Sequence, residues 1–597
     1  MIRKVNTRQR WRILNRMIMN TFITVAVIEF SQVGAGFIDG VIVSRFFGAD
    51  EIAAVGIALP FFSLVGVFGG ILAVGMQMRC TQEIGRGNVQ KMNEIFSFTL
   101  SVGLILSLVL TTVLMLFSEE MAMLFGASGN AEKLLTSTSL YLRGVTLGLP
   151  ALILNAIIAP AIELDGNQKC IKIGALLNAA FDIVFDVIAV LLGWGIWGIG
   201  IATSLSAYVN LMTLLLHFAR KGRMVRFVRF HMGIQEFLNM LYIGSNKAVK
   251  RVCKLIRPII VNAIIISYGG AVAMSALAIR NNFFDFVNIL PTGIVGATSL
   301  LVSIYYGEVN EEAIRSTGSY VHRLWLAVSG GTCVILLVFA RPIAGFYVSD
   351  NRELMDLCTF AIRALGLQIP VSTLVQARCG YLQAIHKTKN MQIVTILSYL
   401  VCVIASSFVM GQLFGTYGIL ACFTVSELLV LIMIEIYYMI KCRKLRLSPE
   451  DYLDLPGNFH LSPGDVISLD VRDLEDASLA SEQIILFCKG HKIDKRTGYF
   501  AGLCAEELTS NVIKFGFTES RGTDKTIDLR VVIWDHKMVI RICDNCPAFD
   551  IQKKIASLME DSDNLSNIGI RITSKIASDI RYVRMMNTNN VIIQYGI

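Results

Sequence analysis

Runs of about 18 or more apolar residues recur along this 597-residue chain as far as Tyr438, and no other feature constrains its fold as strongly. Hydrophobic residues make up 54% of the sequence and charged residues only 17%. A run of this length crosses a bilayer as a helix, because a helix satisfies its own backbone hydrogen bonds where water is absent. The sequence therefore predicts a polytopic α-helical membrane protein with about twelve spans, near residues 17–46, 52–80, 95–117, 137–162, 171–192, 196–219, 241–268, 273–305, 320–340, 357–384, 391–411 and 417–441.

The basic residues predict how these spans are oriented. Lys and Arg cluster in the leader (3–16), between the sixth and seventh spans (220–229) and after the twelfth span (441–446). With twelve spans all three clusters fall on one side, which the positive-inside rule makes cytoplasmic. The first apolar run is longer than that of a signal peptide, so we expect it to stay as a helix. The chain is thus expected in the inner (cytoplasmic) membrane with both termini in the cytoplasm.

The two halves of the membrane part repeat each other. Pro150 and Pro370 are 220 positions apart, as are Lys169 and Lys389, and the words GIGIA at 198–202 and GILA at 418–421 keep the same offset. Gly85 and Gly307 differ by 222. Such a repeat predicts two six-helix bundles, residues 1–230 and 231–446, with a solute path between them and binding sites near the midplane.

A carboxylate in the middle of the first span is the first candidate site. An ionisable group inside a span is costly and usually serves a function, although Asp39 could also be a structural residue satisfied by its neighbours. Asn178 and Asp182 are four residues apart and share a face of the fifth span. Asp186 follows one turn later and reads as a further member of this group or as an interfacial charge.

The segments FIDGVIVS (37–44) and GADEIAAVGIALP (48–60) resemble the N-terminal part of the sequences of multidrug and toxic compound extrusion (MATE) transporters. The repeated landmarks extend the resemblance over about residues 10–445. It implies the MATE fold and a secondary antiporter that exports a small organic solute or drug by alternating access, driven by H⁺ or Na⁺. It also implies that Asp39, Asn178 and Asp182 form the cation-coupling site.

Several polar residues are candidates for the solute cleft. Gln32 lies above Asp39 on the first span, while Glu163 and Asp165 read as part of a solvated loop. A basic row shares one helical face at spacings of 3, 4 and 3, namely Lys247, Lys250, Lys254 and Arg257. We interpret the first two as snorkelling at the boundary, and we assign Lys254 and Arg257, with Arg280, to the cleft. A basic cleft favours an anionic solute; organic cations, which many MATE members carry, are the alternative.

The tail after the last span is a separate domain. Residues 447–465 are rich in Pro, Gly and charge, which predicts a linker. Residues 466–597 then read as helices at 479–488, 497–515 and 568–577 and as strands at 526–534, 537–543, 579–586 and 590–595. Helices combined with an antiparallel sheet predict a two-layer α/β sandwich. The formal charge of +9 divides into +14 for residues 1–446 and −5 for this tail, which argues against nucleic acid as a partner.

Three sequence motifs in the tail, AEELTSNVIKFGF, RICDNCPAFD and LSNIGIRI, resemble those of ATPases with the Bergerat fold of the GHKL type, in the subtype of anti-sigma-factor serine kinases. The resemblance implies ATP with Mg²⁺ as cofactor. It implies Glu507 as general base, Asn511 as the Mg²⁺ ligand, Asp544 as the adenine-binding residue and Gly569 in the phosphate-binding turn. Cys546 and Asn567 depart from the pattern, where Gly is common, so a degenerate structural module stays open.

The remaining alternatives concern the role of the tail. Cys543 and Cys546 form a CxxC pair, but no second pair or nearby His completes a zinc site. No P-loop motif is present, so the tail is not expected to drive transport as an ATP-binding cassette does. We expect it to sense ATP or to act on a cytosolic regulatory protein. A membrane-anchored serine/threonine kinase with a solute-sensing membrane part, and a tail that only docks, are the competing hypotheses.

Overall fold

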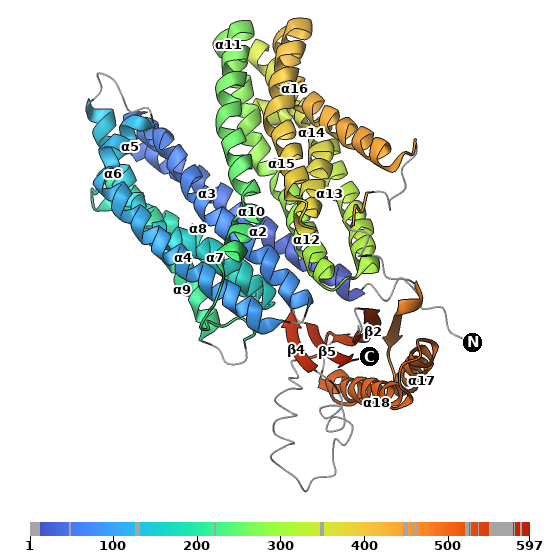
Figure 1. Ribbon diagram of the computed structural model, residues 1–597. Coiled ribbons are helices and arrows are strands. Elements are labelled where there is room, and N and C mark those ends of the chain that lie inside the picture. The colour runs from blue at the N-terminus through green and yellow to red at the C-terminus, as the bar shows by residue number, and fades with distance from the viewer. Residues whose placement is uncertain are drawn as a thin grey trace.

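The computed structural model describes residues 12–46, 49–86, 88–125, 132–219, 223–346, 352–445, 452–455, 459, 463–519, 525, 527–534, 537–547, 577, 579–585 and 588–596. A large helical part is followed by a small domain of strands and helices (Figure 1). The helical part forms two lobes, which lie close together beside the small domain and diverge at the opposite end (Figure 1).

Each half of the sequence builds one lobe. The first lobe contains α2 (Arg12–Phe46), α3 (Ala49–Gly85), α4 (Val89–Leu116), α5 (Ser118–Leu124), α6 (Glu132–Thr146), α7 (Leu149–Leu164), α8 (Gln168–Leu191) and α9 (Gly195–Phe218). The second lobe contains α11 (Asn246–Val287), α12 (Ile289–Gly307), α13 (Glu311–Gly345), α14 (Arg352–Ala384), α15 (Thr388–Ile396), the π-helix η1 (Leu397–Val401) and α16 (Cys402–Cys442). Between them α10 (Ile234–Gly244) packs on α3.

Among the described residues, ten helical segments are long and apolar enough to cross a membrane, and the bent pair α6–α7 adds an eleventh. The segment Thr388–Cys442 counts once, although Gly415 interrupts its helix with a φ of 57° and a ψ of −139°. Glycine adopts such a positive φ at little cost, so it allows a change of direction there. When this segment is divided at Gly415, the number of spans agrees with the predicted twelve.

Two predicted spans are broken rather than continuous. Residues 137–162 form α6 and α7, which meet at 46°, and Pro150 lies in the first turn of α7, where a missing N–H costs nothing. Residues 273–305 are divided between the end of α11 and α12 at Asn288. Apolar length alone could not reveal these breaks, because it indicates how far a run extends but not where its helix changes direction.

The sequence repeat has a structural counterpart at the helix starts. Asn88 and Asn310, which are 222 positions apart, are the N-caps of α4 and α13. Each side-chain oxygen accepts a hydrogen bond from the backbone N–H three residues later, at 3.1 Å in both cases. The lobes therefore repeat local structure as well as helix order.

The C-terminal domain contains a five-stranded antiparallel sheet with strand order β1-β2-β3-β5-β4. Two helices, α17 and α18, lie on the face of the sheet that points away from the lobes (Figure 1). The elements are β1 (Val466–Val471), α17 (Leu474–Gly490), α18 (Lys495–Asn511), the π-helix η4 (Val512–Gly516), α19 (Phe517–Glu519), β2 (Ile527–Trp534), β3 (Lys537–Asp544), β4 (Asp579–Met585) and β5 (Thr588–Gly596).

Alternation along β2 and β3 gives the sheet two different faces. Leu529, Val531, Ile540 and Ile542 are buried in one core with residues of α17 and α18. Residues between them point to the opposite face, because side chains alternate along a strand. The predicted pairing of residues 526–534 with 537–543 is confirmed, whereas β1 was not predicted. The helix expected at 568–577 lies outside the described residues, apart from Ala577.

Close helix contact in the first lobe yields a test of the fold. A Cβ atom at Gly200 would lie 2.6 Å from the carbonyl oxygen of Tyr141, so α6 and α9 can approach only with glycine there. We expect Gly200→Val to destabilise the protein by about 1–3 kcal/mol through overpacking. The matched control is Gly330→Val, since a Cβ atom there meets open space. Thermal unfolding in detergent would measure both, and equal melting temperatures would contradict the packing.

Candidate functional site

Three carboxylates meet inside the first lobe where α2 packs along α8. Asp39 from α2 interacts electrostatically with Asp182 and Asp186 from α8. Asp182 is 4% exposed and Asp186 is fully buried. The Ser206 hydroxyl of α9 donates a hydrogen bond of 2.9 Å to Asp182 Oδ1. Asp186 thus belongs to the carboxylate cluster, and Asn178 lies one turn before Asp182 on the same helix, half-buried.

The cluster is short of hydrogen-bond donors. Oδ1 of Asp39 and both carboxylate oxygens of Asp186 are buried and receive no hydrogen bond from another described residue, and the two carboxyls lie close enough to share a proton. Leaving such acceptors unsatisfied is costly, and close carboxylates repel one another when both are ionised. Proton uptake or a bound cation would relieve both costs. No group of three or more His, Cys, Asp or Glu residues that could hold a metal ion occurs in the described part of the chain.

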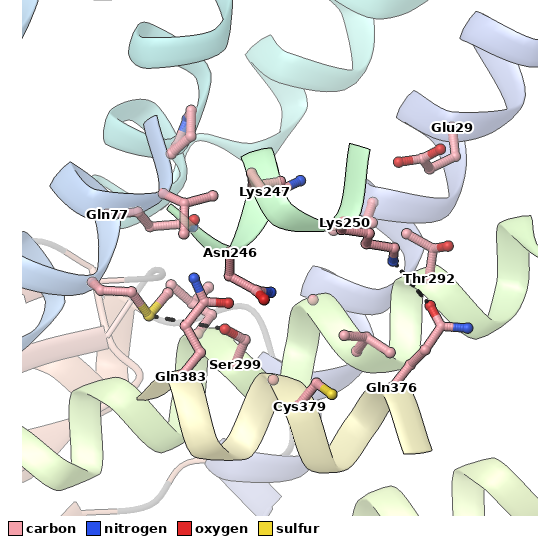
Figure 2. Close-up of a pocket in the computed structure, with 18 of the residues that line it drawn as sticks. Glu29, Gln77, Asn246, Lys247, Lys250, Thr292, Ser299, Gln376, Cys379 and Gln383 are labelled. Atoms are coloured by element: carbon pink, nitrogen blue, oxygen red, sulfur yellow. Dashed lines mark hydrogen bonds between the residues drawn. The ribbon is translucent and has the colours of Figure 1, made fainter. Parts of the chain in front are cut away.

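A cavity of about 320 Å³ lies between the two lobes (Figure 2). Its first-lobe wall comes from α2, α3, α7 and α8, and its second-lobe wall from α11, α12, α14, α15 and η1. Ten of the lining residues are labelled in Figure 2, namely Glu29, Gln77, Asn246, Lys247, Lys250, Thr292, Ser299, Gln376, Cys379 and Gln383. The wall mixes apolar side chains with few charges, which is typical of a small-molecule site.

The residues predicted for the cleft do not line this cavity. Gln32 is exposed on α2 and does not line it. Lys254 is exposed further along α11. Arg257 and Arg280 lie over the ring of Phe423, at 5.5 Å and 3.9 Å. None of these three basic residues lines the cavity.

Two sequence interpretations were wrong here. Lys247 and Lys250 do not snorkel to a boundary but line the cavity, because the start of α11 lies between the lobes. Glu163 is no solvated loop residue: it is 7% exposed, lines the cavity and accepts a hydrogen bond from Gln77 at 3.2 Å. Asp165 is also buried, 2.7 Å from Nε2 of His217. Local sequence places these residues at helix ends but cannot show that the ends are covered.

The candidate nucleotide residues of the tail occupy neighbouring elements. Asn511 Nδ2 donates to Glu507 Oε1 at 3.3 Å on α18, so both side chains share a face. Asp544 ends β3, and its Oδ1 accepts from Asn589 Nδ2 at 2.8 Å and from the Cys546 N–H at 2.9 Å. Gly569 lies outside the described residues.

The loop after β3 meets the end of the α18 segment. A Cβ atom at Gly516 would lie 3.0 Å from the Cβ atom of Cys546, so the two segments approach closely. The CxxC pair does not form a disulfide. Burial raises the pKa of the Cys543 thiol to about 12, which keeps it protonated and unreactive.

The outer face of the tail sheet docks on the turn between α12 and α13. Arg541 Nη1 lies 2.5 Å from Oε2 of Glu308, and its other guanidinium nitrogens donate to Asn590 Oδ1 at 2.8 and 3.1 Å. Arg530, the cross-strand neighbour of Arg541, donates to the carbonyl oxygen of Val309 at 3.2 Å. These two arginines therefore fix the tail to the end at which the lobes meet. No sequence motif signals this contact, since its partners lie more than 200 residues apart.

The segment before β1 is also anchored to the helical part. Asp454 forms ion pairs with Lys387, at 2.6 Å, and with Lys441. Burial alone would raise the pKa of Asp454, but its hydrogen bonds to the two lysines outweigh burial and lower the pKa.

An aromatic stack covers the junction of the lobes. The ring of Phe459 stacks on Tyr306 at 5.1 Å, and the opposite neighbour of Tyr306 is His386 at 6.1 Å. His386 bonds to Gln82 of the first lobe. Burial, with the charges of Arg79 and Arg86, lowers the pKa of His386 to about 4, so its ring is neutral.

Comparisons with known proteins agree with this architecture. The MatE family model matches residues 25–188 and 248–409. Multidrug export protein MepA of Staphylococcus haemolyticus (strain JCSC1435) is 23% identical over 391 residues, covering 63% of this chain and 82% of that protein. MepA of Staphylococcus aureus (strain MSSA476) is 22% identical over 397 residues, covering 66% and 86%.

Solved structures share the fold. An outward-facing multidrug resistance transporter of the MATE family gives a TM-score of 0.67 at 19% identity, covering 72% of this chain and 96% of that chain. A transporter from Pyrococcus furiosus, whose title reports a binding pocket of reverse polarity, gives 0.66 at 19% identity, covering 73% and 97%. The segments matched by the family model end at residue 409, before the tail.

The docking contact can be tested by removing its cation. In Arg541→Gln the buried carboxylate of Glu308 loses its ion-pair partner and keeps only the more distant charge of Arg530; breaking a buried ion pair typically costs about 3–5 kcal/mol. We expect faster hydrogen exchange at residues 308–310 and on β3, with the lobes unchanged. The exposed Arg496 provides the control Arg496→Gln. Unchanged exchange in Arg541→Gln, or no recovery in the charge-swapped pair Glu308→Arg with Arg541→Glu, would contradict the contact.

Proposed function

Because the chain belongs to the MatE family of membrane transporters, we propose that it is a secondary antiporter that exports a small organic solute or drug. The relatives named multidrug export protein support this choice of cargo. The observation that carries the proposal is the buried carboxylate cluster of Asp39, Asp182 and Asp186, in which Asp39 and Asp186 have buried oxygens that receive no hydrogen bond from another described residue. An inward flow of H⁺ or Na⁺ would be its energy source.

Coupling requires that the ion binds the two conformations with different affinity. In this conformation α2 lies against α8 and the carboxylates are close together, so a proton or cation is favoured between them. A conformation that opens the cluster to water would release the ion. Since α2 also forms part of the cavity wall, through Thr24, Val25, Ile28 and Glu29, a shift of this helix would change both sites.

We propose further that the tail is cytoplasmic and binds ATP with Mg²⁺ as a regulatory domain. The pair Glu507–Asn511 on one helix face and the buried Asp544 nearby support a nucleotide site. Mg²⁺ suits this arrangement because it commonly takes one or two protein ligands together with phosphate oxygens. The contact of Arg541 with Glu308 would relay occupancy of that site to the end at which the lobes meet.

A second candidate function is a membrane-anchored serine/threonine kinase that senses a solute and acts on a cytosolic regulatory protein. The specific observation in its favour is that the proposed general base, Glu507, is held by Asn511 on the same helix. The two functions differ in whether phosphate is transferred and whether solute moves.

Ion coupling predicts a strict requirement for the first-lobe carboxylates. We expect Asp39→Asn to lower gradient-driven export at least about tenfold, because an amide neither takes up a proton nor neutralises a cation. Proteoliposomes with imposed H⁺ or Na⁺ gradients would measure this, with Glu120→Gln, an exposed carboxylate on α5, as control. Full export without any ion gradient, or by Asp39→Asn, would contradict the mechanism.

Nucleotide binding is testable in the full chain. We expect Asn511→Ala to weaken Mg·ATP binding about tenfold, about 1.4 kcal/mol, through loss of one Mg²⁺ ligand. Glu507→Gln should keep binding and abolish any phosphate transfer, and Glu506→Gln on the same helix is the control. Calorimetric titration and transfer of labelled phosphate would measure these effects. If the unmodified chain does not bind ATP, the tail is a docking module instead.

A further inference from the structure

The first turns of α11 concentrate positive charge at the cavity between the lobes. Lys247 and Lys250 line the cavity. Further basic residues follow on α11, namely Arg251, Lys254, Arg257 and Arg280. At 1.5 Å per residue, Arg257 lies about 15 Å along the helix from Lys247, toward the end at which the lobes diverge (Figure 1).

None of these six cations lies within ion-pairing distance of a carboxylate from any residue the structure describes. The hydrogen bonds that the structure shows from Lys250, Arg251 and Arg280 all go to neutral oxygen atoms. Lys250 Nζ donates to Gln376 Oε1 at 3.3 Å and lies 4.9 Å from the centre of the Tyr399 ring. Arg251 Nη1 donates to the carbonyl oxygen of Phe62 at 3.3 Å.

The lack of an ion-pair partner is clearest at Arg280. It is 3% exposed, bonds to the side-chain oxygens of Gln368 and Asn281, and lies over the Phe423 ring. Its Nε has no hydrogen-bond partner among the described residues. A buried cation without a paired anion is costly, because neither Coulomb attraction nor water offsets its desolvation.

Nearby acidic residues do not cancel this charge. Glu29 and Glu163 line the cavity, and Asp285 and Glu427 lie near the basic row, so four carboxylates face six cations. Glu163 accepts its hydrogen bond from Gln77, and Glu427 accepts hydrogen bonds of 3.0 Å from Ser398. These two acids are thus held by neutral donors. Glu29 attracts Lys247, Lys250 and Arg251, and Asp285 attracts Lys254, Arg257 and Arg280, but no such pair is close enough to form an ion pair among the described residues.

We propose that the exported solute is an amphiphilic organic anion, a carboxylate or sulfonate attached to an apolar body. This inference rests on the proposed export function and specifies its cargo. The anionic group would bind Lys247 and Lys250 beside Gln376. The apolar body would pack against Val25, Ile28 and the Tyr399 ring, which also line the cavity. Figure 2 shows both lysines at the cavity. The rest of the basic row would form a path for the anion toward the end at which the lobes diverge.

Binding and transport of two dyes of opposite charge test the proposal. Carboxyfluorescein, an organic anion at neutral pH, should bind the full chain in detergent, as measured by fluorescence polarisation, and should be moved in proteoliposomes, whereas the cation ethidium should do neither. Lys250→Gln should weaken carboxyfluorescein binding about tenfold, and Lys250→Arg should largely restore it. Lys169→Gln, an exposed lysine at the start of α8, is the control, and unchanged melting temperatures show that the variants fold.

The possible outcomes separate the cargo from the function. Binding of carboxyfluorescein that depends on Lys250 supports the anionic cargo. If the dye binds in this way but no ion gradient drives its transport, the export function is overturned and the anionic ligand stands. Asp39-dependent transport of ethidium without binding of carboxyfluorescein would leave export standing and overturn the anionic cargo. Failure of carboxyfluorescein to bind, or binding that Lys250→Gln leaves unchanged, overturns it as well.

Discussion

The contact between the ends of α3 and α12 is the interaction on which the arrangement of the two lobes depends. Thr81 and Ser303, 222 positions apart, share a hydrogen bond of 2.5 Å between their hydroxyl groups. A Cβ atom at Gly307 would lie 2.6 Å from the carbonyl oxygen of Gln82, so the backbones of the two helices approach closely there. Thr81 and Ser303 are equivalent positions of the two sequence repeats. The contact therefore lies at the local two-fold symmetry that relates the two lobes. The lobes are thus held together at this end, and they diverge at the other (Figure 1).

The tail and its linker add to the same closed end. Arg541 binds Glu308 directly after α12, and Phe459 extends a stack over Tyr306 and His386. Any movement that separates α3 from α12 must therefore disturb the bond of His386 to Gln82 and the surroundings of the docked sheet. The free energy of tail docking is thus linked to the conformational equilibrium of the lobes, in whichever direction a ligand of the tail acts.

Charge is divided between the lobes in a way that separates two tasks. The first lobe buries Asp39 and Asp186, which have oxygens without a donor, and the second lobe holds cations that form no ion pair with a described residue. Because the two groups lie in different lobes, they form no ion pairs with each other among the described residues. The cavity between the lobes lies where α2 and α11 both contribute to the wall, which lets one conformational change affect both groups.

The sequence by itself determined the membrane class, the repeat and the local faces, because apolar length and helical spacing follow from the order of residues alone. It placed Asn178 with Asp182, and Glu507 with Asn511, since four residues span about one helical turn. Only the tertiary structure decided that Asp186 joins Asp39, that Lys247, Lys250 and Glu163 line the cavity, and that Arg541 binds Glu308. Each of these contacts joins distant segments. Periodicity shows which residues share a face, but packing decides which faces meet.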